Sequence, residues 1–302
     1  MNTRTIALAG ATGHLGALIG DAVLDRPRTQ LKLLVRPGER HRVAAFEARG
    51  AQVVEGGLDA DHGRVLDALC DGASSVVCAV QGGPDVIIDG QARLLRAARA
   101  AGVGRVVPAD FVANLFGIPP GRITPLDWRR DFAALADAER GPVEVVHVLN
   151  GGFLDRRVLF APDIIDVRTA TAFVWGDGRQ LMDWTTCADV ARYTAAVALD
   201  DAAVPPVFPV AGDVLDFHGI VRAYEAGSGR QLRVERLGSL DDLDAHIDQL
   251  QQGGPANFPT YFPLMCYRAM LNGEGKLEVL MNDRYPSIHP TTVREYVARE
   301  AI

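Results

Sequence analysis

The sequence predicts an α/β protein with a doubly wound parallel sheet and a smaller C-terminal domain. Short apolar runs alternate with helix-like segments through the first half of the chain. The runs contain almost no polar residues, which is typical of parallel strands that helices cover on both faces. A glycine-rich turn follows the first run, and right-handed crossovers between successive runs then wind the sheet in both directions.

Each element is expected from its local pattern. The apolar runs are rich in Val, Leu and Ile, and they predict strands at residues 5–9, 31–35, 52–54, 75–80, 105–107 and 143–148. Between them apolar residues recur at helical spacing, as at positions 15, 18, 19 and 23. This spacing predicts helices at residues 15–24, 42–49, 63–69, 89–101 and 126–139.

The pattern becomes irregular after residue 151. A helix at 189–199 and a strand at 207–210 fit a return to the sheet, and further helices are expected at 240–250 and 261–271. We therefore expect a nucleotide-binding domain at 1–152, to which 184–212 returns. Residues 153–183 and 213–302 then form a smaller substrate or cap domain.

The composition excludes several classes of function. Of 302 residues, 48% are hydrophobic and 23% charged, and the net charge is −7. This balance is ordinary for a soluble globular protein and opposite in sign to a nucleic-acid-binding surface. No apolar run reaches the length of a membrane span, and the N-terminus leads into a strand without a signal peptide. We expect a cytoplasmic monomer or homodimer that binds a small molecule.

Neither cysteine nor histidine spacing predicts a metal site. The seven histidines show no ligand spacing, and the four cysteines contain no Cys-x-x-Cys pair: Cys70, Cys78, Cys187 and Cys266. A reduced, cytoplasmic protein is the expectation that follows. Of the 31 basic residues only Lys32 and Lys276 are lysines, so lysine-dependent chemistry has few places in this chain.

The turn after the first strand has the spacing of a nucleotide-binding loop. Gly10 permits a tight turn, Gly13 lets a pyrophosphate approach the backbone, and Gly16 lets the helix pack against the strand. The helix that follows offers unpaired N–H groups and a positive dipole end to phosphates. The contacts expected in this loop are Gly10, Thr12, Gly13, His14, Leu15 and Gly16.

The end of the second strand favours NADP(H) over NAD(H). An NAD-binding site places Asp or Glu there to hold the ribose 2′-hydroxyl, whereas this chain has Arg36, with Arg40 close behind. A guanidinium fork on a phosphate contributes about 1.5–3 kcal/mol, or roughly ten- to hundredfold in affinity. Further cofactor contacts are expected where other strands end: Leu58, Val80, Gln81, Pro108 and Asn150.

Taken together, these residues and several downstream resemble the NmrA-like and isoflavone reductase-like branch of the short-chain dehydrogenase/reductase superfamily. The matching segments are residues 10–16, 34–36, Gln91 with 97–103, 105–111 and 183–192. The resemblance implies a Rossmann-type domain that binds NADP(H), and an oxidoreductase activity.

The chain departs from that family at its catalytic positions. Reductases of the family carry Pro-Ser-Glu/Asp-Phe-Gly after the fifth strand, where this chain has Ala109 for the serine and Val112 for the glycine. They also carry a catalytic lysine on the next helix, where this chain offers Arg129 or Asp131, depending on the anchor used for matching. Arginine holds a substrate oxygen but keeps its own proton. We therefore expect Arg129 to orient the substrate and Asp110, or a water, to relay the proton.

Aromatic side chains provide candidates for a flat substrate's pocket. These are Phe111, Trp128, Phe153, Trp184 and Tyr261, and each has the alternative of lying in the core. His147 lies in a strand and is expected to be a buried histidine with its hydrogen bonds satisfied.

Two functions fit these observations. The first is an NADPH-dependent reductase of a small aromatic or conjugated carbonyl-type compound. The second is a non-catalytic, NADP(H)-sensing regulator that binds a protein partner, and the missing lysine motivates it. A regulator of this kind must bind its partner with different affinity in the presence of NADP+ and of NADPH.

Overall fold

The computed structural model describes residues 3–59, 63–161 and 163–302. The chain divides into two compact units. The first unit comprises Met1–Phe111, Thr124–Val148 and Val190–Phe208, and the second comprises Val112–Ile123, Leu149–Asp189 and Pro209–Ile302. Segments 112–123, 149–152, 184–189 and 209–212, which the sequence analysis placed in the first domain, group with the second unit.

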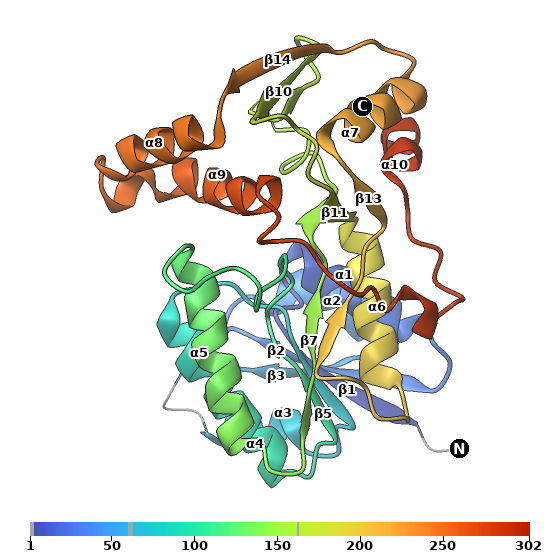
Figure 1. Ribbon diagram of the computed structural model, residues 1–302. Helices are drawn as coiled ribbons and strands as arrows, with labels where there is room; N and C mark the ends of the chain where they lie inside the picture. Colours follow the sequence, from blue (N-terminus) through green and yellow to red (C-terminus); the bar gives the residue numbers. More distant parts are fainter. Residues whose placement is uncertain (1–2, 60–62, 162) are drawn as a thin grey trace. The chain divides into compact units, whose positions relative to one another are not determined.

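A six-stranded sheet forms the centre of the first unit, in the order β3-β2-β1-β4-β5-β6 (Figure 1). Its strands are β1 Arg4–Ala9, β2 Thr29–Val35, β3 Gln52–Glu55, β4 Ser75–Cys78, β5 Arg105–Val107 and β6 Glu144–Val145. Every neighbouring pair in the sheet is parallel. The strand order reverses between β1 and β4, which confirms the doubly wound parallel sheet predicted from the sequence.

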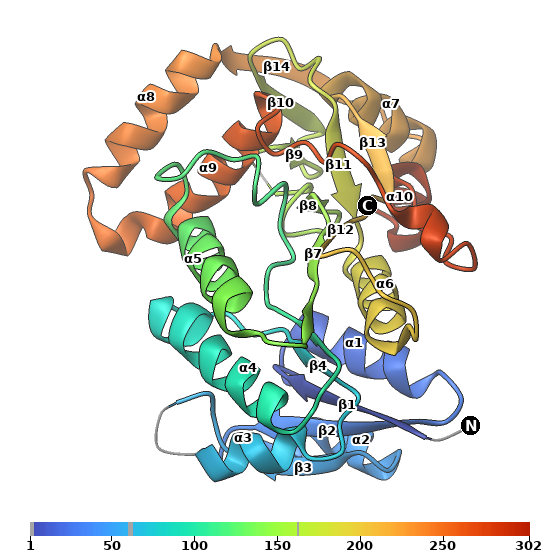
Figure 2. The ribbon, with the colours of Figure 1, turned by 60° about the horizontal axis from the view of Figure 1, so that its bottom comes forward.

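Helices cover both faces of this sheet (Figure 2). They are α1 His14–Leu24, α2 Ala44–Ala48, α3 Gly63–Cys70, α4 Gln91–Ala100, α5 Thr124–Glu139 and α6 Cys187–Leu199. Alternate strand residues such as Ala7, Val76 and Val106 share one core cluster with side chains of α3, α4 and α5. Because side chains alternate along a strand, their neighbours Ile6, Leu8 and Val77 point to the other face and are also fully buried.

The segment expected to be one strand at 143–148 contains two short ones. The Val146 N–H donates to Val106 O at 2.9 Å, whereas the next N–H, of His147, donates to Pro206 O at 2.8 Å. The chain therefore changes its partner at this point. β6 pairs with β5, and β7 (His147–Leu149) pairs with β12 (Val207–Pro209).

Two three-stranded sheets and four helices form the second unit. One sheet has the order β14-β10-β9 and the other β13-β11-β8. The elements are β8 Gly152–Phe153, β9 Ile165–Asp166, β10 Thr171–Trp175, β11 Met182–Thr185, β13 Asp213–Leu215, β14 Arg233–Gly238, α7 Phe217–Ser228, α8 Leu240–Gln251, α9 Phe258–Leu271 and α10 Val293–Glu300. The helices expected at 240–250 and 261–271 are confirmed.

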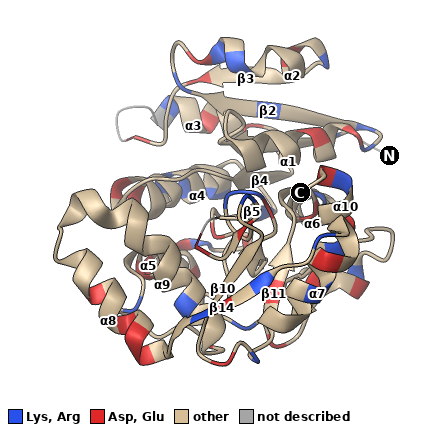
Figure 3. Cartoon of the chain, turned by 90° about the horizontal axis from the view of Figure 1, so that it is seen from above, with Lys and Arg blue, Asp and Glu red and all other residues tan. Residues whose placement is uncertain are grey.

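The second unit has a core of its own, centred on Trp184, Phe217 and Tyr224, each fully buried. Acidic residues gather on α8, as Figure 3 shows, with Asp241 and Asp242 in its first turn. Among the described residues, no helix combines the length and the apolar character that crossing a membrane requires.

Candidate functional site

Steric contacts fix two glycines of the loop after β1. Gly10 has a φ of +98°, and a Cβ there would lie 2.4 Å from Ala79 O, just beyond β4. A Cβ on Gly16 would lie 2.1 Å from Gly10 O. Any side chain at either position would displace backbone, so the turn and the close packing of α1 on β1 both require glycine.

Gly13 differs from these two glycines because the protein leaves room around it. A Cβ there would meet only Gly10 O, at 3.4 Å. Gly13 is exposed and begins α1 as its N-cap, no side chain caps the helix, and the first turn contains no acidic residue. Thr12 and Leu15 are half-buried and His14 is exposed. The start of α1 thus has the features of an anion site: unprotected N–H groups, positive dipole potential and no competing carboxylate.

The arginine at the end of β2 is available to a ligand. Arg36 directly follows Val35, the last residue of the strand, and is exposed. Its guanidinium forms no ion pair with any residue that the structure describes. A phosphate beside this strand end would therefore meet an unengaged cation.

Arg40 is held elsewhere. It lies in a 3₁₀ turn, Arg40–Val43, and donates through Nε and Nη2 to Glu47 Oε1 at 3.0 and 2.6 Å. Its Nη1 also lies 3.6 Å from a carboxylate oxygen of Glu55. In this structure the Arg40 guanidinium already contacts two carboxylates, so it is not free to make the contact expected with the cofactor.

Arg42, which the sequence reasoning missed, lies at the glycine loop instead. Its Nη2 donates to Thr12 O at 2.9 Å and its Nη1 to Glu39 Oε2 at 2.5 Å. The hydrogen bond from Arg42 lowers the pKa of Glu39. Arg42 is only two residues beyond Arg40, so the sequence already placed a second arginine near the loop. Which of the two side chains points to the loop depends on the 3₁₀ turn.

The other predicted cofactor contacts of the first unit follow strands of the same parallel sheet. Leu58 is half-buried beyond β3, and its carbonyl accepts from Arg93 Nε at 2.7 Å. Val80 is half-buried and Gln81 exposed beyond β4, and Pro108 is buried just after β5. Because the carboxyl ends of parallel strands share one edge, these residues lie along the edge that carries the glycine loop.

Asp110 pairs with His147. His147 Nδ1 lies 2.5 Å from Asp110 Oδ2, and the exposed fractions of the two side chains are 7% and 0%. The other carboxylate oxygen, Oδ1, is buried and has no hydrogen-bond partner among the described residues. Phe111, the next residue, is buried and has a φ of +36°, which is strained for a side chain of this size. The pairing joins residues 37 apart in the sequence, and no local pattern indicates it.

Arg129 extends from α5 to the segment that carries Asp110. Its Nε donates to Ala109 O at 3.0 Å and its Nη1 to Pro125 O at 2.7 Å. Cys78, at the end of β4, has its pKa raised to about 12 by burial and, less strongly, by the charge of Asp110, while Arg129 opposes the shift. The Cys78 thiol therefore stays neutral. Trp128 is half-buried and packs against the core beneath α3, α4 and α5.

The remaining predicted site residues belong to the second unit. Asn150 is fully buried, donates its N–H to Val112 O at 2.9 Å, and has an unpartnered side-chain Oδ1. Phe153, in β8, and Tyr261, in α9, are half-buried, and the Tyr261 ring packs edge-on against Phe258 with centroids 5.5 Å apart. Trp184 is fully buried in the core of this unit. In this structure Trp184 packs in the core, and a contact between it and the substrate stays a prediction.

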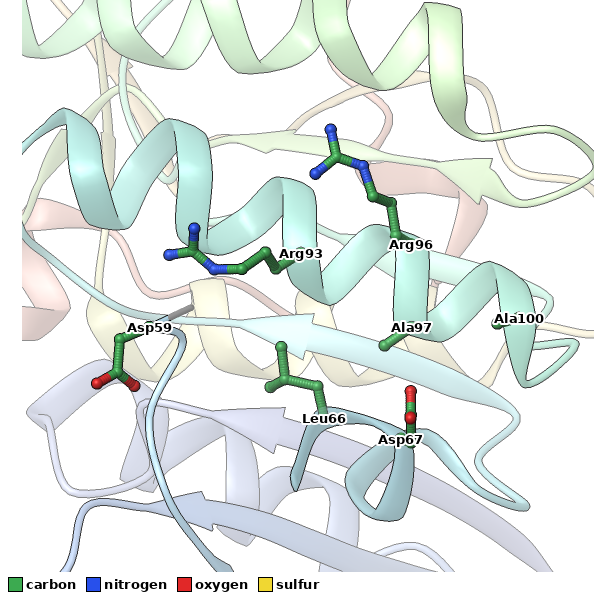
Figure 4. A pocket seen from close by; sticks show the side chains of 7 residues that line it. All are labelled: Asp59, Leu66, Asp67, Arg93, Arg96, Ala97 and Ala100. Carbon is green, nitrogen blue, oxygen red and sulfur yellow. The ribbon is translucent and has the colours of Figure 1, made fainter. Parts of the chain in front are cut away.

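A pocket of about 280 Å³ lies between α3 and α4 (Figure 4), and none of the predicted site residues lines it, although Leu58 adjoins its lining residue Asp59. Its charged lining consists of two carboxylates, Asp59 and Asp67, and two guanidinium groups, Arg93 and Arg96. The guanidinium groups are already engaged, Arg93 by Leu58 O and Arg96 by both carboxylate oxygens of Glu139. Within the described ranges no group of three His, Cys, Asp or Glu residues could hold a metal ion.

The first unit thus combines a parallel sheet, a glycine loop at its switch point and an arginine at the end of β2. Comparison with known families agrees with this geometry. Residues 2–115 match the NmrA-like family. The resemblance inferred from the glycine loop and the segment after the fifth strand is confirmed by this match.

Beyond residues 2–115, the chain is similar to known reductases along nearly its whole length. The bifunctional pinoresinol-lariciresinol reductase of Sinopodophyllum hexandrum is 24% identical over 311 residues, which cover 97% of this chain and 98% of that protein. A solved isoflavone reductase has a TM-score of 0.83 at 19% identity, covering 99% of this chain and 100% of that one. Leucoanthocyanidin reductase from Vitis vinifera, solved with NADPH, has a TM-score of 0.79 at 20% identity, covering 99% of both chains. These solved structures share the fold.

Proposed function

We propose that this protein is an NADPH-dependent reductase of a small aromatic or conjugated carbonyl-type substrate. One observation carries the proposal: an uncapped helix start and an unengaged arginine lie at the carboxyl edge of a doubly wound sheet. The similarity to reductases of aromatic compounds, one of them solved with NADPH, supports the same function.

The residues of the first unit fit an NADP(H) molecule. The start of α1 would hold the pyrophosphate, because Gly13 offers room there and no carboxylate competes. Arg36 would hold the 2′-phosphate, and Arg42 fixes the loop beside it through Thr12 O. When bound, the nicotinamide supplies a hydride. The protein must supply orientation, electrostatic stabilisation and a proton.

Proton supply is where this chain differs from the reductases it resembles. No lysine lies on α5, and Arg129 keeps its proton at any working pH. Arg129 can still stabilise charge on a substrate oxygen, because its guanidinium is a fixed cation at the same edge as Asp110. We assign the proton to Asp110, acting directly or through a water.

The aromatic character of the substrate rests on the named reductases and on partly exposed aromatic side chains. In the first unit Trp128 is half-buried, so part of this residue stays exposed. Flat rings stack on such surfaces with about 0.5–1.5 kcal/mol beyond the area they bury.

Calorimetry and turnover together test this function. Titration with NADPH, NADP+, NADH and NAD+ should give binding that is roughly ten- to hundredfold tighter for the two phosphorylated coenzymes. NADPH oxidation should then be detected with at least one member of a panel of quinones, enals and aryl ethers. Absence of heat with every coenzyme would remove the proposed cofactor. Tight NADPH binding with no turnover across the panel would favour the sensing regulator.

A further inference from the structure

The side chains of the polar pair Asp110–His147 are almost completely buried. His147 stands between Val146 and Val148, both fully buried, and Asp110 comes just after Val106 and Val107 of β5, which are also buried. Burying a carboxylate costs several kcal/mol unless hydrogen bonds compensate it. His147 compensates one oxygen only, through the contact between its Nδ1 and Oδ2 at 2.5 Å.

The other carboxylate oxygen of Asp110, Oδ1, is available to a further hydrogen-bond partner. Oδ1 is buried, and no group in the described part of the chain bonds it. An unsatisfied buried acceptor costs about 1–3 kcal/mol, so a purely structural pair would be expected to bond both oxygens. Asp110 lies three residues beyond β5, at the sheet edge where ligands of such folds bind. A hydroxyl or a water at Oδ1 would satisfy this oxygen.

We propose that Asp110 is the proton donor of the reaction and that His147 is its positioning residue. This inference rests on the proposed reductase function and extends it. His147 holds Oδ2 through its Nδ1, which fixes the carboxyl plane and leaves Oδ1 to exchange a proton with the substrate. His147 lies in β7, whose pairing holds its backbone, and its side chain is buried.

The step balances with one proton and one hydride. The O–H bond at Asp110 Oδ1 breaks, and a new O–H bond forms on the substrate oxygen, directly or through one water. The substrate carbon gains the hydride that bound NADPH supplies, and the C=O electron pair moves to the oxygen. Asp110 is left as a carboxylate, which the Nδ1–H of His147 stabilises, and solvent returns the proton afterwards.

The groups around the pair are compatible with this role. Cys78 from β4 is a neutral thiol, since burial raises its pKa to about 12. Arg129 from α5 is a permanent cation that favours the carboxylate product. Gln91 from α4 is neutral and accepts the Ala109 N–H at 2.8 Å, which holds the segment before Asp110 in place.

Substitutions at position 147 separate positioning from folding. In His147→Asn the side-chain amide nitrogen takes a place near that of Nδ1 and keeps a donor for Oδ2. His147→Val has nearly the same volume and no donor. We expect kcat to fall roughly ten- to hundredfold in His147→Val, the loss of a hydrogen bond to a buried charged group, and to recover largely in His147→Asn. Asp110→Asn should lose about 10²–10⁴ in kcat.

Three readouts accompany kcat. NADPH affinity and thermal melting are measured for every variant, with the exposed His41→Asn as control. In nuclear magnetic resonance spectra, wild type should show a strongly downfield Nδ1 proton from His147 that Asp110→Asn lacks.

The outcomes distinguish this inference from the proposed function. Equal kcat in wild type and in a folded, NADPH-binding His147→Val overturns the positioning role. Equal losses in His147→Val and His147→Asn overturn it as well, since a donor alone then does not suffice. Wild type that shows the downfield proton but binds no NADPH, or turns over no substrate, overturns the reductase function and the relay with it, while the hydrogen-bonded pair itself stands.

Discussion

Each glycine of the loop after β1 meets a different constraint. Gly16 is closed to any side chain by Gly10 O, and Gly10 by Ala79 O, whereas Gly13 has space for a methyl group. Two of these glycines therefore serve the fold. We expect the third to serve the ligand, because only a bound pyrophosphate would make its missing side chain necessary.

Alanine substitution should separate these roles. We expect Gly16→Ala to destabilise the protein by about 1–3 kcal/mol, because its Cβ would push backbone apart. Gly13→Ala should keep the wild-type melting temperature and lose NADPH affinity. Thermal melting and calorimetry on both variants give the comparison. An unchanged NADPH affinity in Gly13→Ala would contradict a phosphate bound at the start of α1.

Arg36 and Arg40 provide a second matched pair. Arg36→Ala should reduce NADPH affinity roughly ten- to hundredfold and leave NADH affinity unchanged, because it removes the cation expected at the 2′-phosphate. Arg40→Ala should change the preference little, since Glu47 and Glu55 hold Arg40 away from the loop. Titration of both variants with both coenzymes tests this. A larger loss of NADPH affinity in Arg40→Ala than in Arg36→Ala would instead indicate Arg40 as the residue that binds the 2′-phosphate.

Site residues whose role depends on the local backbone could be predicted from the sequence. Those whose role depends on the direction of a side chain, or on a contact between residues far apart in the sequence, could not. The glycine loop was predictable because chain neighbours create its steric demands. Arg42 was missed because a 3₁₀ turn points Arg40 and Arg42 in different directions. The Asp110–His147 pair was missed because its two residues are far apart in the sequence. Only the fold brings β7 to the end of β5.

At the scale of elements, two helices of the second unit begin with complete capping boxes. Ser239 and Asp242 bond each other's backbone N–H groups at α8, and Thr292 and Glu295 do the same at α10. These hydrogen bonds lower the pKa of both carboxyl groups. A carboxyl with a lowered pKa stabilises the folded state above its unfolded pKa, and this contribution disappears as the pH falls through the folded pKa.

Ser239→Ala should therefore have a pH-dependent effect. At neutral pH we expect a loss of about 0.5–2 kcal/mol in the free energy of unfolding, as is usual for an N-cap. In acid the loss should shrink, because Asp242 is then protonated and no longer completes the box. Denaturant unfolding at both pH values measures it, with the exposed Ser287→Ala as control. A loss that grows on acidification would contradict the capping box.

Element boundaries were predicted well where apolar periodicity is local and poorly where pairing decides. The first five strands of the six-stranded sheet, and the helices that cover it, were predicted from apolar runs and helical spacing. Both patterns are visible within six to fifteen consecutive residues. The division of 143–148 into β6 and β7 could not be predicted in this way. It arises because the backbone N–H groups change their hydrogen-bond acceptor from Val106 to Pro206 at this point. A single sequence contains no signal for such an exchange.

At the scale of the whole molecule, the proposed cofactor residues Gly10 to Arg42 belong to one unit and the core around Trp184 to the other. Coenzyme binding should therefore stabilise the first unit directly. At a hundredfold excess over Kd, NADPH should add about 2.7 kcal/mol to its unfolding free energy, and hydrogen exchange should slow in β1, α1 and β2. NADH at the same concentration should protect less, and Arg36→Ala should remove the difference between the two. Equal protection by NADH and NADPH in wild type would show that the 2′-phosphate makes no contact, and the assignment of Arg36 would fail.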